Sequence, residues 1–301
     1  MVPAPVPTIA DVLSRGEAPT FSFEYFPPKD AAGVEQLRRA IDGLQELRPD
    51  WVSVTYGATG ATRDRTFEAT RVIRDATPTM TMGHLTVAGQ TVDEVRGAVR
   101  SYADLGIRHI LALRGDPPGG PSARFEPHPT GLANATELVR LVKSMGDFTV
   151  GVAAFPDGHP DRFDHDLDVS ILLDKERAGA EFAITQLFFS ADAYRDLVAR
   201  FRARGGTMPI VAGIMPVTSV GQIERFRAMS GVAMPDSFVR PLLAVAEDRQ
   251  AFREVGLDQM TRLCDDVLAS GAPGLQFFTL NRSPATSEIL ARLRRIPPHR
   301  G

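Results

Sequence analysis

A single carboxylate, Glu24, stands in an aromatic stretch at residues 21–28. The alternation of a β-strand places Glu24 on the same face as Ser22 and Phe26, and two prolines then end the strand. Apolar surroundings disfavour a charge, so desolvation is expected to raise the pKa of this carboxyl. A glutamate of that kind stays protonated near neutral pH and can act as a general acid. The plainer alternative is a glutamate on an edge strand that faces water.

Further polar and aromatic residues occur where other apolar, strand-like runs end. They are Thr55, Tyr56, His84, Arg114, Gly115, Asp116, Phe155, Gln186, Met215, Asn281 and Arg282. The set contains acids, an arginine and groups that stack or form hydrogen bonds, but no obvious nucleophile. This profile favours a site that binds an organic cofactor, which then supplies the chemistry.

Each of these residues also has a simpler explanation. Arg114 and Asp116 could pair with each other. His84 could be a hydrogen-bonded core histidine, and Gln186 could satisfy backbone groups. Lys175, late in a predicted helix, would by default be solvated.

No metal site is expected, because His159 and His165 are too isolated from cysteine or acidic partners at the spacing of zinc ligands. A phosphate-binding glycine loop and a nucleophile elbow are also missing from the sequence.

The elements that must position these residues alternate along the chain. Strands are predicted at 21–26, 51–57, 79–87, 109–115, 149–156, 182–189, 209–217 and 275–281. Helices are predicted at 30–47, 64–75, 91–105, 134–145, 166–178, 190–204 and 283–295, with two or three more between 219 and 270, broken at Pro235 and Pro241. Eight such units favour an α/β fold, a single (β/α)8 TIM barrel with extra helices between strands seven and eight. An open doubly wound sheet is the alternative, but no G-x-G-x-x-G motif follows a strand.

The composition sets outer limits on function. The 301 residues are 43% hydrophobic and 24% charged, with a net charge of −3, so nucleic acid is not an expected partner. The single cysteine, Cys264, excludes an internal disulfide. Neither a signal peptide nor a run of transmembrane length is evident, so we expect no membrane association and a cytoplasmic protein. One catalytic domain is expected over 1–301, with the barrel at about 20–296 and no regulatory domain.

Six motifs carry a resemblance to a known family. FEYFPP (23–28), VSVTYGA (52–58), HLT (84–86), ALRGD (112–116), ITQ (184–186) and FTLNR (278–282) occur in this order. Together they resemble the bacterial methylenetetrahydrofolate reductases, from about the first strand to the last helix.

The resemblance implies a flavoprotein that reduces 5,10-methylenetetrahydrofolate to 5-methyltetrahydrofolate with NADH or NADPH through FAD, feeding methyl groups to methionine synthesis. Glu24 matches the general acid, and Asp116 matches a carboxylate near flavin and folate. The matched cofactor contacts are Thr55, Tyr56, Ala58, His84, Arg114, Gly115, Asp116, Phe155, His159, Asp168 and Lys175. The matched substrate contacts are Gln186, Gln222, Phe226 and Arg282. Homo-oligomers are common in the family, and no fingerprint distinguishes NADH from NADPH.

Four positions depart from the family pattern on the FAD side. Phe155 and Asn134 replace tyrosines, Ile171 replaces an asparagine, and Asp174 replaces an arginine. We therefore expect FAD to be held weakly. Two other functions stay open: a lyase or aldolase that uses Lys175 as a Schiff base, and a non-catalytic protein that kept the barrel. The helical position of Lys175 disfavours the first, and Glu24 in an apolar strand disfavours the second.

Overall fold

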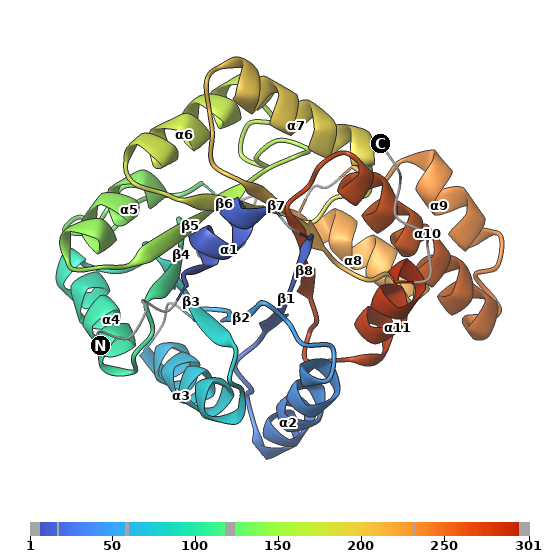
Figure 1. Cartoon of the computed structure of the whole chain (residues 1–301), viewed down its shortest axis with the longest axis horizontal. Helices are drawn as coiled ribbons and strands as arrows, with labels where there is room; N and C mark the ends of the chain where they lie inside the picture. Colours follow the sequence, from blue (N-terminus) through green and yellow to red (C-terminus); the bar gives the residue numbers. More distant parts are fainter. Residues whose placement is uncertain (1–6, 17, 58–59, 118–123, 231–232, 295–301) are drawn as a thin grey trace.

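Eight parallel strands close into one barrel in the order of the sequence (Figure 1). The computed structural model describes residues 7–16, 18–57, 60–117, 124–230 and 233–294. The strands are β1 (Thr20–Tyr25), β2 (Trp51–Val54), β3 (Met80–Thr86), β4 (His109–Leu113), β5 (Thr149–Ala154), β6 (Phe182–Thr185), β7 (Ile210–Ile214) and β8 (Gly274–Phe278). Pairing of β8 with β1 completes the ring. The predicted TIM barrel is confirmed, and the open sheet is excluded.

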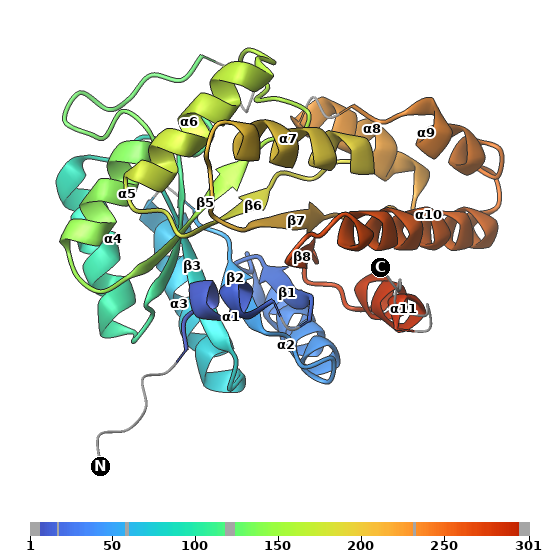
Figure 2. The same cartoon turned by 45° about the horizontal axis from the view of Figure 1, so that its top comes forward.

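Helices surround the barrel and cover its outer face (Figures 1 and 2). They are α2 (Ala31–Gln45), α3 (Gly60–Ala76), α4 (Val92–Asp104), α5 (Ala135–Ser144), α6 (His165–Arg177), α7 (Ala191–Ala203), α8 (Val220–Ser230), α9 (Asp236–Leu243), α10 (Arg249–Ala269) and α11 (Pro284–Leu293). Outward strand residues such as Phe23 and Val52 join the large apolar core beneath these helices. The inward residues of the same strands, including Ser22 and Glu24, are therefore left to line the barrel interior.

One helix was not predicted. α1 (Ile9–Arg15) begins with a capping box between Thr8 and Asp11 and lies across the barrel in Figure 1. Ile9 and Leu13 pack with inward residues such as Trp51, and so close the end of the barrel at which the strands begin. Seven residues are too few for a helical period to stand out in the sequence.

The extra helices between β7 and β8 are α8, α9 and α10, as predicted. The expected break at Pro241 is wrong, because this proline lies inside α9. A proline removes the N–H that would bond to the carbonyl four residues earlier, that of Ser237. The side-chain amide of Gln259 in α10 donates to this carbonyl at 3.4 Å, which compensates for part of the loss. Pro235, by contrast, does precede the helix.

Most strands end earlier than predicted. β2 stops at Val54, β6 at Thr185 and β8 at Phe278. The predicted site residues therefore lie mainly in the loops that follow the strands, at the carboxyl end of the barrel.

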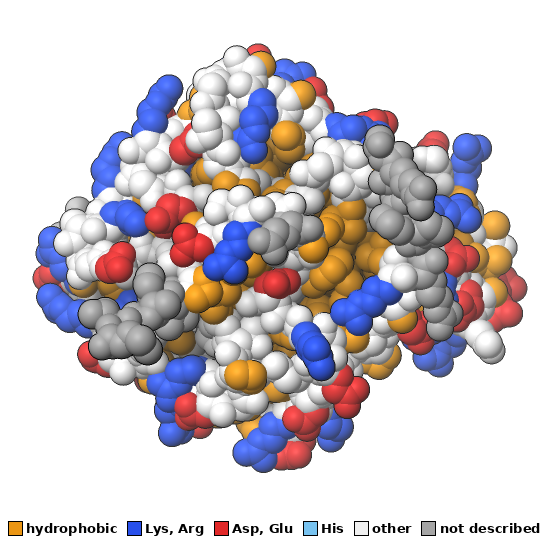
Figure 3. All heavy atoms as spheres, viewed as in Figure 1, with side chains coloured by type: hydrophobic (Ala, Val, Ile, Leu, Met, Phe, Trp, Pro, Cys, Tyr) orange, Lys and Arg blue, Asp and Glu red, His pale blue; other side chains and the backbone are white. Residues whose placement is uncertain are grey.

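Charged side chains of both signs are spread over the face drawn in Figure 3, and apolar side chains gather near α8 and β8. In the described part of the chain no helix is both long and apolar enough to cross a membrane.

Candidate active site

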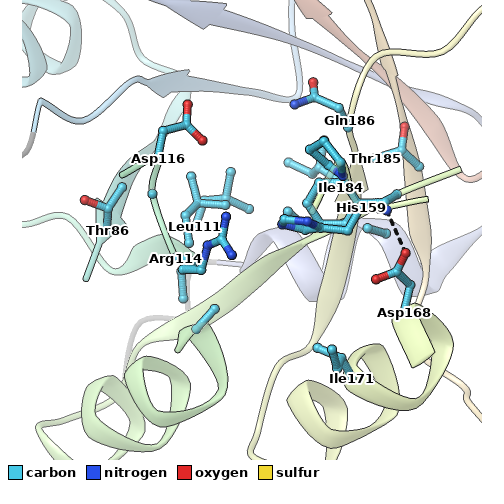
Figure 4. A pocket seen from close by; sticks show the side chains of 18 of the residues that line it. Thr86, Leu111, Arg114, Asp116, His159, Asp168, Ile171, Ile184, Thr185 and Gln186 are labelled. Atoms are coloured by element: carbon cyan, nitrogen blue, oxygen red, sulfur yellow. Dashed lines mark hydrogen bonds between the residues drawn. The ribbon is translucent and has the colours of Figure 1, made fainter. Parts of the chain in front are cut away.

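A cavity of about 1300 Å³ opens at the carboxyl ends of the strands. It brings together most of the predicted site residues, and Figure 4 shows part of its lining. The predicted residues that line it are Glu24, Thr55, Tyr56, His84, Arg114, Gly115, Asp116, Phe155, His159, Asp168, Lys175, Gln186 and Phe226.

Glu24 lies at the inner end of this cavity and is 6% exposed. The Thr55 hydroxyl donates to Oε1 at 3.0 Å, and the Gln276 amide donates to Oε2 at 3.2 Å. Burial raises the pKa of Glu24 to about 7, although both hydrogen bonds oppose the rise. Glu24 is therefore a carboxylic acid that can give and regain a proton near neutral pH.

His84 is the closest ionisable neighbour of Glu24 in the described structure, with Nε2 at 3.7 Å from Oε2. Burial lowers the pKa of His84 to about 3, so the imidazole is neutral at physiological pH. Charging either group would cost solvation, and the neutral pair is favoured over an ion pair. The alternative of a hydrogen-bonded core histidine does not hold for Nε2, which has no partner among the described residues.

Arg114 does not pair with Asp116. Its guanidinium forms an ion pair with Asp161 and lies 4.8 Å from the centre of the Phe125 ring. The proposed Arg114–Asp116 pair is therefore corrected. Gly115 turns the chain between them with a φ of +81°, and a Cβ there would lie 2.8 Å from that of Thr86. This position requires glycine, and the turn leaves Asp116 exposed on the cavity wall.

The loop between β5 and α6 forms the other wall. Asp168 accepts from the backbone N–H of His159 at 2.7 Å, drawn dashed in Figure 4, and from Arg162 at 2.6 Å. Lys175 is 7% exposed and donates to the carbonyl of Ala153 at 2.8 Å. Burial lowers the pKa of Lys175 to about 8. The expectation of a solvated lysine is therefore wrong.

The four departures from the family pattern also lie at the cavity. The Phe155 ring lies 4.6 Å from that of His159, and Ile171 lines the wall near them. Asn134 caps α5 by accepting from the N–H of Glu137. The exposed Asp174 pairs with Arg177 on the same helix.

Two of the predicted site residues that the structure describes, Gln222 and Arg282, are not brought to the cavity. The side-chain amide of Gln222, in the first turn of α8, accepts from the Thr218 N–H at 2.7 Å and donates to the Pro216 carbonyl at 3.1 Å. Arg282 is exposed, and like Gln222 it is not part of the lining. Ala58 lies outside the described residues. Phe226 does line the cavity and stacks on Phe189.

Two functional candidates were missed in the sequence. Gln276 touches Glu24 from β8, and a lone amide inside the apolar run 275–278 was the available signal. Asp161 binds Arg114 from a loop, and no sequence pattern announces a partner 47 residues away.

The cavity fits a large polar ligand. Four buried polar atoms that line it have no hydrogen-bond partner among the described residues: His84 Nε2, Thr86 Oγ1, Arg114 Nε and Asp157 Oδ2. Arg114, Arg162 and Lys175 supply the positive charge that a pyrophosphate needs. This donor set fits FAD, with the reservation that Asp161 and Asp168 already engage both arginines. The described residues contain no cluster able to hold a metal ion.

A (β/α)8 barrel with a buried acid at the carboxyl ends of its strands defines an enzyme of the TIM-barrel class. A sequence profile described as methylenetetrahydrofolate reductase matches residues 8–294. The 5,10-methylenetetrahydrofolate reductase of Escherichia coli K12 is 37% identical over 268 residues, covering 89% of this chain and 88% of that protein. The chain belongs to the methylenetetrahydrofolate reductase family, whose members are oxidoreductases.

A second relative is less similar, and one solved structure shares the fold. Methylenetetrahydrofolate reductase 1 of Schizosaccharomyces pombe is 34% identical over 280 residues, which are 92% of this chain and 46% of that protein. A Clostridium thermocellum protein described as binding two copies of 5-methyl-5,6,7,8-tetrahydrofolic acid shares the fold, with a TM-score of 0.63, 15% identity, and coverage of 94% of this chain and 97% of that one. Family membership removes the lyase and the non-catalytic alternatives.

Proposed function

We propose that this protein reduces 5,10-methylenetetrahydrofolate to 5-methyltetrahydrofolate with NADH or NADPH, using weakly held FAD, and so feeds methyl groups to methionine synthesis in the cytoplasm. The observation that carries the proposal is Glu24, a buried acid with a pKa of about 7 at the inner end of a large cavity. The names of the relatives support folate as the substrate.

In this proposal Glu24 gives its proton to a nitrogen of the folate's five-membered ring. The C–N bond then breaks and leaves a cationic iminium, which a hydride converts to the methyl group. The carboxylate of Asp116, which also lines the cavity, stabilises that cation. Gln186 and Phe226 would bind the folate, together with Gln222 and Arg282 if these approach the cavity in the complex.

Bound FAD would supply the hydride chemistry between the nicotinamide and the folate. The residues proposed to hold it are Thr55, Tyr56, Ala58, His84, Arg114, Gly115, Asp116, Phe155, His159, Asp168 and Lys175. Asp161 would compete with FAD for Arg114. The side chains of Ile171 and Phe155 have no group that could form a hydrogen bond with FAD. These features support weak retention of FAD.

The test separates the two half-reactions in Glu24→Gln. Reduction of bound FAD by NAD(P)H should persist, because it needs no proton from Glu24. Folate reduction should fall at least ~100-fold, the usual scale for losing a general acid. Glu35→Gln, at an exposed position on α2, is the matched control. Near-normal folate turnover in Glu24→Gln would remove Glu24 from the mechanism.

A further inference from the structure

Gln276 lies at the centre of the barrel and is 0% exposed. Its Oε1 accepts from the Ser22 hydroxyl at 3.0 Å and from the indole N–H of Trp51 at 3.2 Å. Its Nε2 donates to the Ser53 hydroxyl at 3.0 Å and to Glu24 Oε2 at 3.2 Å. The two lone pairs and two hydrogens of the amide are therefore all engaged.

One of these partners fixes the orientation of the amide. Hydroxyl groups donate or accept as required, but the indole of Trp51 can only donate. The amide oxygen of Gln276 must face Trp51, which turns the amide nitrogen toward Glu24. A rotated amide would set two donors against each other beside Trp51 and leave a buried N–H without an acceptor.

This fixed donor has two effects on Glu24. It favours the ionised carboxylate, because an N–H bonds more strongly to a charged oxygen than to a neutral one. It also favours Oε2 as the carbonyl oxygen of the neutral acid, which leaves the proton on Oε1. There the Thr55 hydroxyl can accept it while donating to the Tyr25 carbonyl, 3.3 Å away.

We propose that Gln276 is a positioning residue that acts through Glu24: its amide, held in one orientation by Trp51, fixes the carboxyl and keeps its proton transferable inside an apolar barrel. The inference deepens the proposed function and rests on it. It gives a residue inside β8, and not only residues at the strand ends, a role in the proposed proton transfer.

The neighbours of Glu24 support this assignment. β2 presents Ser53, the loop after it presents Thr55, and β8 presents Gln276; none of these side chains ionises at ordinary pH. β3 presents His84, which stays neutral, since burial lowers its pKa to about 3. Arg114 and Asp116, after β4, are charged and also line the cavity, but neither forms an ion pair or a hydrogen bond with Glu24 in the described structure. Hydrogen bonding by Thr55 and Gln276 is thus the main local influence that opposes burial.

Gln276→Met tests the proposal by removing the amide while keeping the length of the side chain. Folate reduction requires protonated Glu24, so it should decline with rising pH through the pKa of that group. In Gln276→Met this decline should move upward by about one pH unit, the scale of one lost hydrogen bond to the charged form. The rate below the decline should fall about tenfold, because the carboxyl is no longer held in place.

A second readout does not depend on folate. Infrared difference spectra can follow the protonated carboxyl band of Glu24, identified by its absence in Glu24→Gln, and its titration should shift in the same direction. Trp51→Phe keeps Gln276 but frees its amide to rotate, and should also raise the pKa of Glu24. Thr279→Val is the matched control: Thr279 donates to the backbone carbonyl of Glu24 at 2.6 Å and does not bond to the carboxyl, so the decline should stay in place.

The outcomes are distinct. A lower rate with an unmoved decline and an unmoved infrared titration in both Gln276→Met and Trp51→Phe would make Gln276 a structural residue and overturn the proposal. Absence of folate reduction in the parent protein at every pH would instead contradict the proposed function. The infrared titration would still decide whether Gln276 controls the Glu24 proton.

Discussion

Two opposing influences act on the Glu24 carboxyl. Removal from water favours the neutral acid, while donors from Thr55 and Gln276 favour the anion. Their balance leaves a pKa near 7, where a general acid works best at physiological pH. His84 contributes little charge, because its own burial keeps it neutral. The acid strength is therefore a property of hydrogen bonds and burial together.

Asp116 offers a separate test at the residue scale. Asp116→Asn removes a negative charge from the cavity wall, so support for the cationic folate weakens and folate reduction should slow by about tenfold or more. Loss of that charge should also raise the reduction potential of bound FAD. Stopped-flow kinetics and a redox titration measure the two effects, with Asp93→Asn on the exposed face of α4 as control. An unchanged rate together with an unchanged potential would place Asp116 outside the chemistry.

At the scale of elements, the loop before α6 decides how well the cavity receives a phosphate. Asp161 in this loop engages Arg114, and Asp168 at the start of α6 engages Arg162. A phosphate must compete with these carboxylates for its cations. The Arg114–Asp161 pair is partly exposed, and pairs of that kind are weak, so a ligand can compete for Arg114. Asp168 is buried, so Arg162 is held more firmly.

Charge changes in this loop and helix should tighten FAD binding. Asp161→Asn frees Arg114, and Asp174→Arg replaces a repulsive charge near Lys175. Each should improve affinity by about fivefold, and by more at low salt, because the charges lie near solvent. Fluorescence quenching at two ionic strengths measures this, with Asp192→Asn on α7 as control. Tight, salt-insensitive binding by the parent protein would show that these departures do not affect FAD.

The sequence predicted the elements better than their connections. Alternation of apolar strands and amphipathic helices was sufficient for the barrel, and the polar residues after the strands marked the cavity. Helix α1, which closes one end of the barrel, is too short to show a helical period in the sequence. The sequence also does not show that Gln259 compensates for Pro241 inside α9. The Arg114–Asp161 pair and the Gln276 network join segments far apart in the chain, so only packing reveals them.

For the molecule as a whole, Glu24 and His84 link stability to pH in opposite directions. The folded pKa of Glu24 is raised from 4.5 to about 7, so its stabilising contribution is complete below 4.5 and is lost as pH rises through 7. The folded pKa of His84 is lowered from 6.5 to about 3, so its contribution is complete above 6.5 and is lost as pH falls toward 3. The contribution of Glu24 falls above about pH 4.5 and that of His84 falls below about pH 6.5, so together these two groups favour maximal stability between those pH values.

Glu24→Gln should therefore stabilise the fold in alkaline solution. It removes the cost of ionising a buried carboxyl, so its free energy of unfolding should exceed that of the parent by up to about 3 kcal/mol at pH 8 and match it near pH 4.5. Denaturant titrations at the two pH values measure the difference. Glu35→Gln, on the surface, should show no such dependence, and an equal difference at both pH values would refute the linkage.

The closure of one barrel end by α1 also affects when Glu24 can regain its proton in each catalytic cycle. Ile9 and Leu13 close one end of the barrel, and Trp51 and Met82 fill the space behind Glu24. Within the described structure, solvent therefore meets Glu24 through the cavity mouth, the same passage that the folate must use. A bound product would block the return of a proton. In the proposed reaction Glu24 would therefore regain its proton only after the methylated folate has left, so product release would precede recovery of the acid.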